Sequence, residues 1–348
     1  MKCPRAVEGR RLDRLRRPIS ILVVAAMIVA AIGRPAWAET VKIGLSKSTT
    51  AGGIFIAQDK GYFAAVGLTP EFVMFDSSEP IAVAVVSGAV DFGHTGASAG
   101  LYSLAGQGAL KIVAAASREA PSFQVNGVVA SNRAYDAGLR TLKDLGGHSV
   151  AISQFGSPPH YSLALIEEKY GIEPKSVRVT ALQSNPNILS AMTGGQIDAS
   201  VMLAAAMMPA VARGDMKLLA FIGDETPWQT GVVFTATKTT NDHRDIVERF
   251  LGAVRKGKHD YYDAFIDAAG RRQDGPQADA MLAIIAKYLN QPVEQLRPAI
   301  AYVDPDGRLD VKDVLHQVDW FRGQGMIKGD FEAATVMDMR FVIPLPTK

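Results

Sequence analysis

Cysteine is almost absent from this sequence of 348 residues. The single cysteine is Cys3, so the chain from residue 39 onward contains none. That part of the chain forms no disulfide and offers no thiolate nucleophile. Its stability must come from hydrophobic cores, and hydrophobic residues make up 48% of the chain. A chain of this length and composition predicts two globular domains.

Metal-ligand patterns are scarce as well. The six histidines, at positions 94, 148, 160, 243, 259 and 316, are scattered, and no pair has the spacing of a metal site. The histidines therefore predict no metal site, and we expect no cofactor.

Only one long apolar run is present, from Ile19 to Ile32. It is shorter than the roughly 20 residues that a membrane-spanning helix needs. Seven Lys and Arg residues precede it within residues 2–17, and small residues follow at Ala36 and Ala38. This order is typical of a cleaved secretory signal peptide over residues 1–38, and it predicts a periplasmic protein. Arg16-Arg17 leaves the choice between the general and the twin-arginine export route open.

A strong net charge is also missing. The whole chain has 37 basic and 35 acidic residues, and residues 1–38 hold 8 of the basic and 2 of the acidic ones. The remaining chain therefore has 29 basic against 33 acidic residues. No basic patch interleaved with aromatic residues is present in it, so we expect no nucleic-acid partner.

The most informative feature is an internal repeat with an offset of 107 residues. Residues 75–81 (FDSSEPI) correspond to 182–188 (LQSNPNI), and Asp91 corresponds to Asp198. The match extends backward to residues 41–46 and 148–153. With a slip of one residue it extends forward, so that Lys111 corresponds to Lys217. A unit of this size is large enough to form the core of a small domain.

Each copy of the repeat alternates predicted strands with predicted helices. In the first copy we expect a helix over 52–65 and a short strand over 90–92. Alternation of this kind predicts an α/β fold in which each lobe is a mostly parallel sheet flanked by helices. We expect the chain to return to the first lobe near 231–237. The expected helices of the C-terminal extension cover 242–268, 276–289, 292–300 and 311–322.

Several motifs resemble those of one family in their order along the chain. Residues 56–63 (IAQDKGYF) with Gly67-Leu68, then 87–93 (SGAVDFG), 142–151 (LKDLGGHSVA) and 194–199 (GGQIDA) carry the resemblance. They are similar to the substrate-binding proteins of ABC importers, in the branch that handles sulfonates, taurine, nitrate and thiamine-pyrimidine precursors.

This resemblance implies a two-lobed periplasmic-binding-protein fold of type II, which closes on a small molecule like a hinge. It implies an ABC permease in the inner membrane as the partner, no metal and no catalysis, and we expect a monomer. The expected lobes are 39–127 plus 229–348 for lobe one and 128–228 for lobe two. Two alternatives remain: a sensory binding protein for a receptor kinase, and an enzyme related to pyrimidine-precursor synthases. The Cys-rich loop of those synthases has no counterpart here.

The ligand of such a fold is expected beyond the carboxyl ends of the strands. The loops at these places are rich in Ser, Thr, Gly and Asn, which suits a polar or anionic ligand near helix N-termini. We expect Ser157 to cap the helix that begins at Pro158-Pro159. The predicted ligand-binding residues are Lys47, Ser48, Thr49, Ser77, Ser78, Gly96, Ser98, Arg118, Gly156, Ser157, His160, Gln183, Asn185, Met202 and Trp228.

Some of these residues also have a structural interpretation. Met202 either lines an apolar wall of the cleft or belongs to the core. Trp228 either stacks on a ligand or lines the hinge. The family places an aromatic and acidic cluster where this chain has residues 201–209 (VMLAAAMMP), so sulfonate or nitrate specificity does not transfer directly. We interpret the repeat-related Asp91 and Asp198 as structural residues in their lobes.

Overall fold

The computed structural model describes residues 38–75 and 77–346. The chain from Glu39 onward forms one compact unit, which contains two five-stranded sheets. Residues 1–37 of the predicted signal peptide lie outside the described residues.

The first sheet has the strand order β2-β1-β3-β10-β4. Strand β1 is parallel to β2 and β3, whereas β10 runs antiparallel to β3 and β4. The strands are β1 (Glu39–Ser46), β2 (Leu68–Phe75), β3 (Phe92–Gly96), β4 (Leu110–Glu119) and β10 (Trp228–Ala236).

The second sheet repeats this pattern in the order β7-β6-β8-β5-β9. Strand β6 is parallel to β7 and β8, and β5 runs antiparallel to β8 and β9. Each sheet is therefore mostly parallel, as the repeat predicts, and each has one reversed strand in the same place. The strands are β5 (Asn126–Ser131), β6 (Ser149–Ile152), β7 (Arg178–Ala181), β8 (Ala199–Leu203) and β9 (Met216–Phe221).

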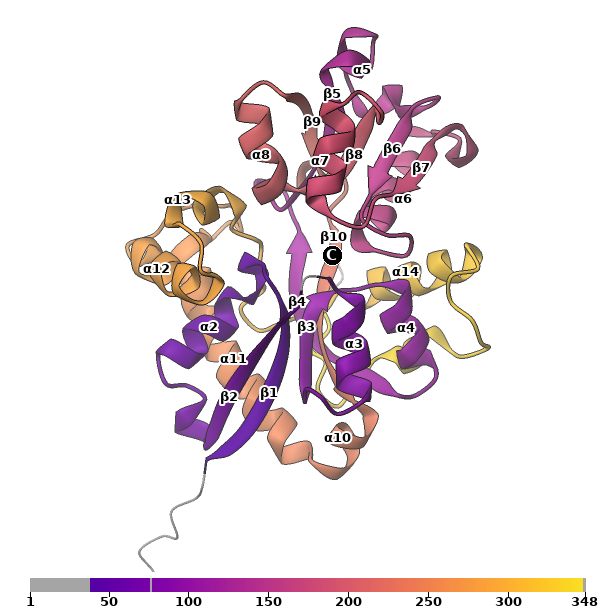
Figure 1. Cartoon of the computed structure of the whole chain (residues 1–348). Coiled ribbons are helices and arrows are strands. Elements are labelled where there is room, and N and C mark those ends of the chain that lie inside the picture. The colour runs from indigo at the N-terminus through magenta and orange to yellow at the C-terminus, as the bar shows by residue number, and fades with distance from the viewer. Residues whose placement is uncertain (1–37, 76, 347–348) are drawn as a thin grey trace, which may run out of the picture. The chain divides into compact units, whose positions relative to one another are not determined.

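The reversed strands are the two connections between the sheets (Figure 1). Strand β5 follows β4 of the first sheet and pairs within the second. Strand β10 comes after the second sheet and pairs within the first. The chain thus crosses twice, and each crossing ends in a strand buried between two others.

Helices flank both sheets, and a helical region follows β10 (Figure 1). The helices and 3-10 turns before β10 are η1 (Thr49–Ala51), α2 (Gly52–Asp59), η2 (Ala64–Val66), α3 (Glu79–Val86), α4 (Ala99–Gly106), α5 (Asn132–Asp136), η3 (Leu142–Leu145), α6 (Pro158–Tyr170), η4 (Pro174–Ser176), α7 (Asn185–Thr193), α8 (Ala204–Ala212) and α9 (Ile222–Glu225). Those after it are α10 (Thr237–Asp242), α11 (Arg244–Phe265), α12 (Ala278–Leu289), α13 (Val293–Leu296), η5 (Arg297–Ala299), α14 (Val311–Gly323) and η6 (Ala333–Val336).

Two elements expected in the first copy of the repeat differ from the structure. In the C-terminal region, the helix expected over 242–268 ends at Phe265, and the one expected over 292–300 is the short α13 followed by the 3-10 turn η5. The helix expected over 52–65 is wrong in its second half, because α2 ends at Asp59 and Gly61 has a left-handed backbone with φ 73°. The short strand expected over 90–92 begins only at Phe92 and extends to Gly96. Asp91 lies just before this strand, and its side chain accepts a hydrogen bond from the backbone of β1.

The two repeat-related aspartates, Asp91 and Asp198, accept equivalent backbone hydrogen bonds in their lobes. The Lys42 N–H donates to Asp91 Oδ2 at 2.7 Å, and the Ser149 N–H donates to Asp198 Oδ2 at 2.9 Å. Lys42 and Ser149 are themselves 107 residues apart. Each carboxylate therefore ties the loop before the third strand of its lobe to the first strand, and the structural interpretation is confirmed.

The long helix α11 packs against α2 at a close crossing. A Cβ atom on Gly257 would lie 2.0 Å from the Gly53 carbonyl oxygen, so the crossing requires glycine. Phe250, Val254 and Tyr261 of α11 are buried in the core of the first lobe. Burial of a large apolar side chain of this kind contributes about 1.5–3 kcal/mol each. The C-terminal helices thus complete the first lobe.

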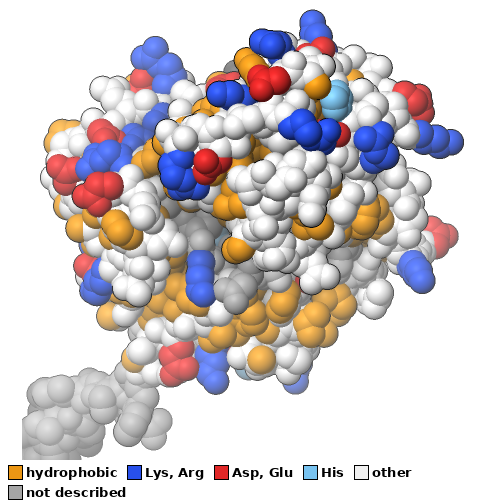
Figure 2. Space-filling view, turned by 45° about the horizontal axis from the view of Figure 1, so that its top comes forward, with side chains coloured by type: hydrophobic (Ala, Val, Ile, Leu, Met, Phe, Trp, Pro, Cys, Tyr) orange, Lys and Arg blue, Asp and Glu red, His pale blue; other side chains and the backbone are white. Residues whose placement is uncertain are grey.

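Across residues 38–75 and 77–346, no helix is long and apolar enough to cross a membrane. On the face shown in Figure 2, Lys and Arg side chains are interspersed with Asp and Glu side chains, and hydrophobic side chains gather toward the lower part. That face carries no continuous basic surface.

Candidate functional site

The carboxyl ends of the parallel strands lead into helix starts in both lobes. Serine hydroxyls cap several of them: Ser48 accepts from Thr50 N, Ser98 from Leu101 N and Ser184 from Asn187 N, each at 3.3 Å. Serine fits because its oxygen satisfies an N–H that lacks a helical partner. Two of these capping serines were predicted as ligand contacts, and Ser184 stands between the predicted Gln183 and Asn185.

Five of the predicted residues lie together, and we call them the cleft-loop cluster: Ser78, Gly96, Ser98, Gly156 and Ser157. The Ala99 N–H, in the first turn of α4, donates to the Gly156 carbonyl at 2.9 Å. A Cβ atom on Gly96 would lie 2.7 Å from Pro158 Cγ. The loop before α6 in the second lobe therefore lies directly against the start of α4 in the first.

Within this cluster, Thr95 Oγ1 donates to Ser78 Oγ at 2.9 Å. Gly156 has a left-handed backbone with φ 77°, and a Cβ there would lie 2.9 Å from Ala99 Cβ. Glycine at this position thus permits both the turn and the close approach of the two lobes.

The expectation that the Ser157 hydroxyl caps α6 is wrong. Ser157 occupies the N-cap position, but its Oγ donates to the Gln154 carbonyl at 2.6 Å. The reason is chemical, because Pro158 and Pro159 have no N–H to offer. The next N–H, of His160, donates to the Ser157 carbonyl instead.

His160 supports the turn of Gly156. Its Nδ1 accepts the Gly156 N–H at 3.1 Å, and its ring lies 5.3 Å from the Phe155 ring and 5.1 Å from the Trp320 ring. Burial lowers the pKa of His160 to about 4, so the imidazole is neutral at pH 7.

Three other predicted residues, Thr49, Arg118 and Met202, form contacts within their own lobe. Thr49 is buried and donates to the Ala299 carbonyl at 2.5 Å. Arg118 pairs with Asp310 at 3.1 Å. Met202 lies in the core of the second lobe. Lys47 and Gln183 are exposed, and Ser48, Ser77 and Asn185 are half-buried.

Trp228, at the start of β10, is 1% exposed. Its ring lies 4.9 Å from that of Tyr161 on α6, whose hydroxyl is 2.6 Å from His316 Nδ1 on α14. Sequence reasoning missed Tyr161, because a tyrosine inside an amphipathic helix carries no signal of a contact between lobes.

A buried polar network behind Trp228 was also missed. Asp313 on α14 accepts the Gln229 N–H at 2.8 Å and the Gln317 side chain at 2.6 Å. Gln317 Nε2 also donates to the Gln229 carbonyl at 2.9 Å, and its Oε1 accepts from the Tyr102 hydroxyl. This network holds α14 on the strand that returns from the second lobe.

Residues 96–100 read Gly-Ala-Ser-Ala-Gly between a strand and a helix, and sequence reasoning overlooked this spacing. It is the spacing of the nucleophile elbow of hydrolases, in which the serine is strained and exposed. Ser98 here is buried and extended, with φ −135° and ψ 162°, and its Oγ accepts from Leu101 N. The segment is a capped helix start.

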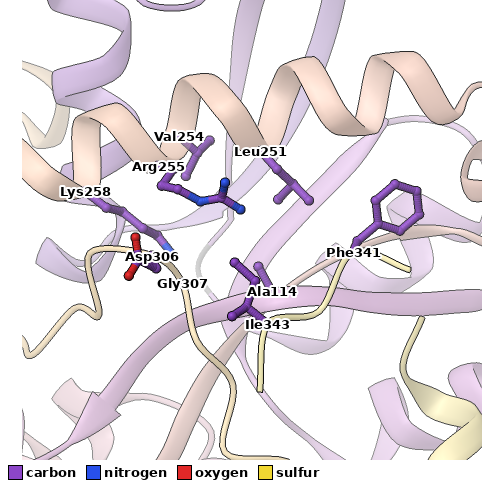
Figure 3. A pocket seen from close by; sticks show the side chains of 9 residues that line it. All are labelled: Ala114, Leu251, Val254, Arg255, Lys258, Asp306, Gly307, Phe341 and Ile343. Atoms are coloured by element: carbon purple, nitrogen blue, oxygen red, sulfur yellow. The ribbon is translucent and has the colours of Figure 1, made fainter. Parts of the chain in front are cut away.

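The pocket in Figure 3 is too small for a solute. It lies between α11 and β4 and has a volume of about 10 Å³, which is room for about one water molecule. Lys258 reaches into this region and donates to the Ala115 carbonyl at 2.5 Å. Burial lowers the pKa of Lys258 to about 8. Among the described residues, no three His, Cys, Asp or Glu side chains are grouped to hold a metal ion.

Two five-stranded α/β sheets joined by two crossover strands define a two-lobed periplasmic-binding-protein fold. The periplasmic aliphatic sulphonate binding protein SsuA from Escherichia coli has this fold, with a TM-score of 0.69 at 17% identity over 89% of this chain and 94% of that one. Residues 48–264 match the family model described as NMT1/THI5 like. The chain belongs to the NMT1/THI5-like family, and the resemblance seen in its motifs is confirmed.

A curated relative is the taurine-binding periplasmic protein of Escherichia coli K12. It is 30% identical over 171 residues, which cover 49% of this chain and 50% of that protein. The match thus spans about half the length of the curated relative.

The fold also occurs in an enzyme. The desulfurization enzyme DSZB has a TM-score of 0.63 at 11% identity, over 88% of this chain and 96% of that one. The fold alone therefore does not separate binding proteins from enzymes.

Proposed function

We propose that this chain is an extracytoplasmic solute-binding protein, which captures a small polar or anionic organic molecule between its lobes and delivers it to an ABC importer without altering it. Its relatives with binding functions support this proposal, as does the predicted signal peptide. We propose lobe boundaries at 127/128 and 228/229, and a monomer as the working form.

One observation carries the proposal. The N–H of Ala99 at the start of α4 reaches across to the carbonyl of Gly156 in the other lobe. Helix starts from both lobes thus face the same place, where the positive ends of their dipoles favour a shared anion. A ligand that contacts both lobes only when they are together stabilises the closed state.

The test uses residues 39–348, screened by thermal shift against taurine, aliphatic sulfonates, nitrate, carboxylates and pyrimidines. Isothermal titration then gives the affinity of each ligand found. We expect one ligand per chain and no product. Conversion of the ligand, detected by mass spectrometry after incubation, would contradict a pure binding function.

The site itself is tested by Gly156→Ala, with Gly147→Ala as the matched control. Both glycines have left-handed backbones in the second lobe, but a Cβ on Gly147 would meet no atom within 4 Å. Both variants should lose about 1–2 kcal/mol of stability from the left-handed backbone alone. Only Gly156→Ala should also weaken ligand binding, by about tenfold or more, because its Cβ pushes the lobes apart. Equal affinities of the two variants would remove this loop from the site.

A further inference from the structure

A groove runs along one face of α6, and α14 of the C-terminal region forms part of its wall. Its volume is about 630 Å³, within the range of about 300–1,000 Å³ of small-molecule sites. The α6 residues that line it are spaced by three and four and so share one helical face: His160, Leu163, Ala164, Glu167 and Glu168.

The two ends of the groove differ in chemistry. At the start of α6 the lining is aromatic, with Phe155, His160 and Trp320, and Phe155 is 55% exposed. Toward the end of α6 the lining becomes acidic. The charged residues there are Glu167, Glu168, Glu173 and Lys175.

Glu167 is the unusual member of this set. It is only 8% exposed, although it lines the groove. Among the described residues its carboxylate has no hydrogen-bond or ion-pair partner. Burial raises the pKa of Glu167 to about 7. A buried carboxylate is costly when charged and unpaired, and a cation placed in the groove would remove that cost.

We propose that this groove is a second binding site, distinct from the cleft-loop cluster, for an organic ammonium cation that carries an apolar or aromatic body. The ammonium group pairs with the Glu167 carboxylate, and the body lies against Leu163, Trp320 and Phe155. His160 and Glu167 are seven residues apart on α6, which is about 10 Å along the helix. The ligand therefore has its charge and its ring separated by several methylene groups.

The experiment titrates residues 39–348 with 4-phenylbutylammonium chloride by calorimetry, and with 4-phenylbutanol as the neutral analogue. Binding of the ammonium, at least tenfold tighter than the alcohol, is expected. Glu167→Gln keeps the size of the side chain and should weaken ammonium binding at least tenfold. Glu248→Gln, on the exposed surface of α11, removes the same charge elsewhere and should leave the affinity unchanged.

A pH series adds a second readout. Ammonium affinity should rise from pH 6 to pH 8 in the native protein, as Glu167 ionises, and stay flat in Glu167→Gln. Glu168, Glu173, Lys175 and His160 also face the groove, and they are unchanged in that variant. No binding at millimolar concentration, equal affinity for the alcohol, or unchanged affinity in Glu167→Gln would overturn the proposal. Displacement by a sulfonate or other cleft ligand would also overturn it, because the two sites would then be one.

Discussion

Each of the two crossings between the lobes carries a glutamate, and the pKa values of these two glutamates are shifted in opposite directions. Glu119 and Glu225 each stand eight residues after the repeat-related Lys111 and Lys217. Glu119 is fully buried and accepts a hydrogen bond from Asn126, and burial raises its pKa to about 8. Glu225 pairs with Lys169 at 2.6 Å, and this partner lowers its pKa.

The difference shows what the repeat preserves. Both copies keep the strand order and the aspartate that ties the first strand to the third. They do not keep the electrostatics of the crossings, because Asn126 is neutral and Lys169 is a cation. The charge of each glutamate is therefore set by its neighbours and not by its place in the repeat.

The largest expected effect comes from Glu119→Gln. The raised pKa of Glu119 means that its favourable contribution is complete below the unfolded pKa near 4.3 and is lost as pH rises through about 8. The amide keeps the bond to Asn126 but never ionises. We expect the variant to be more stable than the native protein by about 4 kcal/mol at pH 8.5, and by little at pH 4.5. Urea unfolding at a series of pH values measures this difference.

The same series with Glu225→Gln is the control, since its carboxylate is already ionised in the folded state at neutral pH. Parallel stability curves for the native protein and Glu119→Gln between pH 4.5 and 8.5 would show that Glu119 is not held in its protonated form.

A second contrast separates the two aspartates. Asp198 is buried, and it accepts from the Ser149 N–H and hydroxyl and pairs with Arg133 at 2.7 Å. Asp91 is exposed and accepts from Lys42. We expect Asp198→Ala to cost about 3 kcal/mol of unfolding free energy and Asp91→Ala about 1 kcal/mol.

Lowering the pH should remove most of this difference in unfolding free energy between the two alanine variants. Burial alone would raise the pKa of Asp198, but the bonds from Ser149 and Arg133 outweigh it and lower the pKa. A lowered pKa gives stability that is present above about pH 4 and lost as pH falls through the folded value. The gap between native protein and Asp198→Ala, measured by urea unfolding, should therefore narrow below pH 4. Equal costs for the two alanine variants at pH 7 would show that both aspartates do no more than cap a turn.

The smallest effect is expected for Glu225→Gln. Its partner Lys169 is 40% exposed, so water screens the pair. The loss should be about 1 kcal/mol or less at pH 7 and should shrink in 0.5 M salt. Thermal unfolding at two salt concentrations measures it. A loss that is independent of salt would point to the Tyr170 hydrogen bond in place of the ion pair.

The lobes, their sheets and most helices could be predicted because they depend on local periodicity and on the repeat. The expected helices 276–289 and 311–322 differ from α12 and α14 by at most two residues at an end. The structural role of Asp91 and Asp198 could be predicted because the two residues occupy equivalent positions in the repeat. The wrong element boundaries in the first copy, at 52–65 and 90–92, lie next to the left-handed Gly61 and to the hydrogen bond of the Asp91 side chain.

Parts of the candidate site depend on contacts between segments far apart in the sequence. Trp228 was left between two interpretations, and only its neighbour Tyr161 shows that it packs between the lobes here. Glu167 lies in helix α6, where a glutamate is expected on the surface. It lines a groove whose wall includes Trp320 of α14, about 150 residues further along the chain, and no local pattern reports such a neighbour.

Strand β10 has a consequence for the order in which the molecule can be completed. It lies between β3 and β4, which precede it by more than 100 residues in the chain. A chain that emerges with its N-terminus first has all five strands of the second sheet by residue 221. At that moment the first sheet still lacks the strand that lies between β3 and β4. The first lobe therefore begins to emerge before the second lobe but can complete its sheet only after it. Strand β4 stays without its neighbour β10 until residue 236 has emerged.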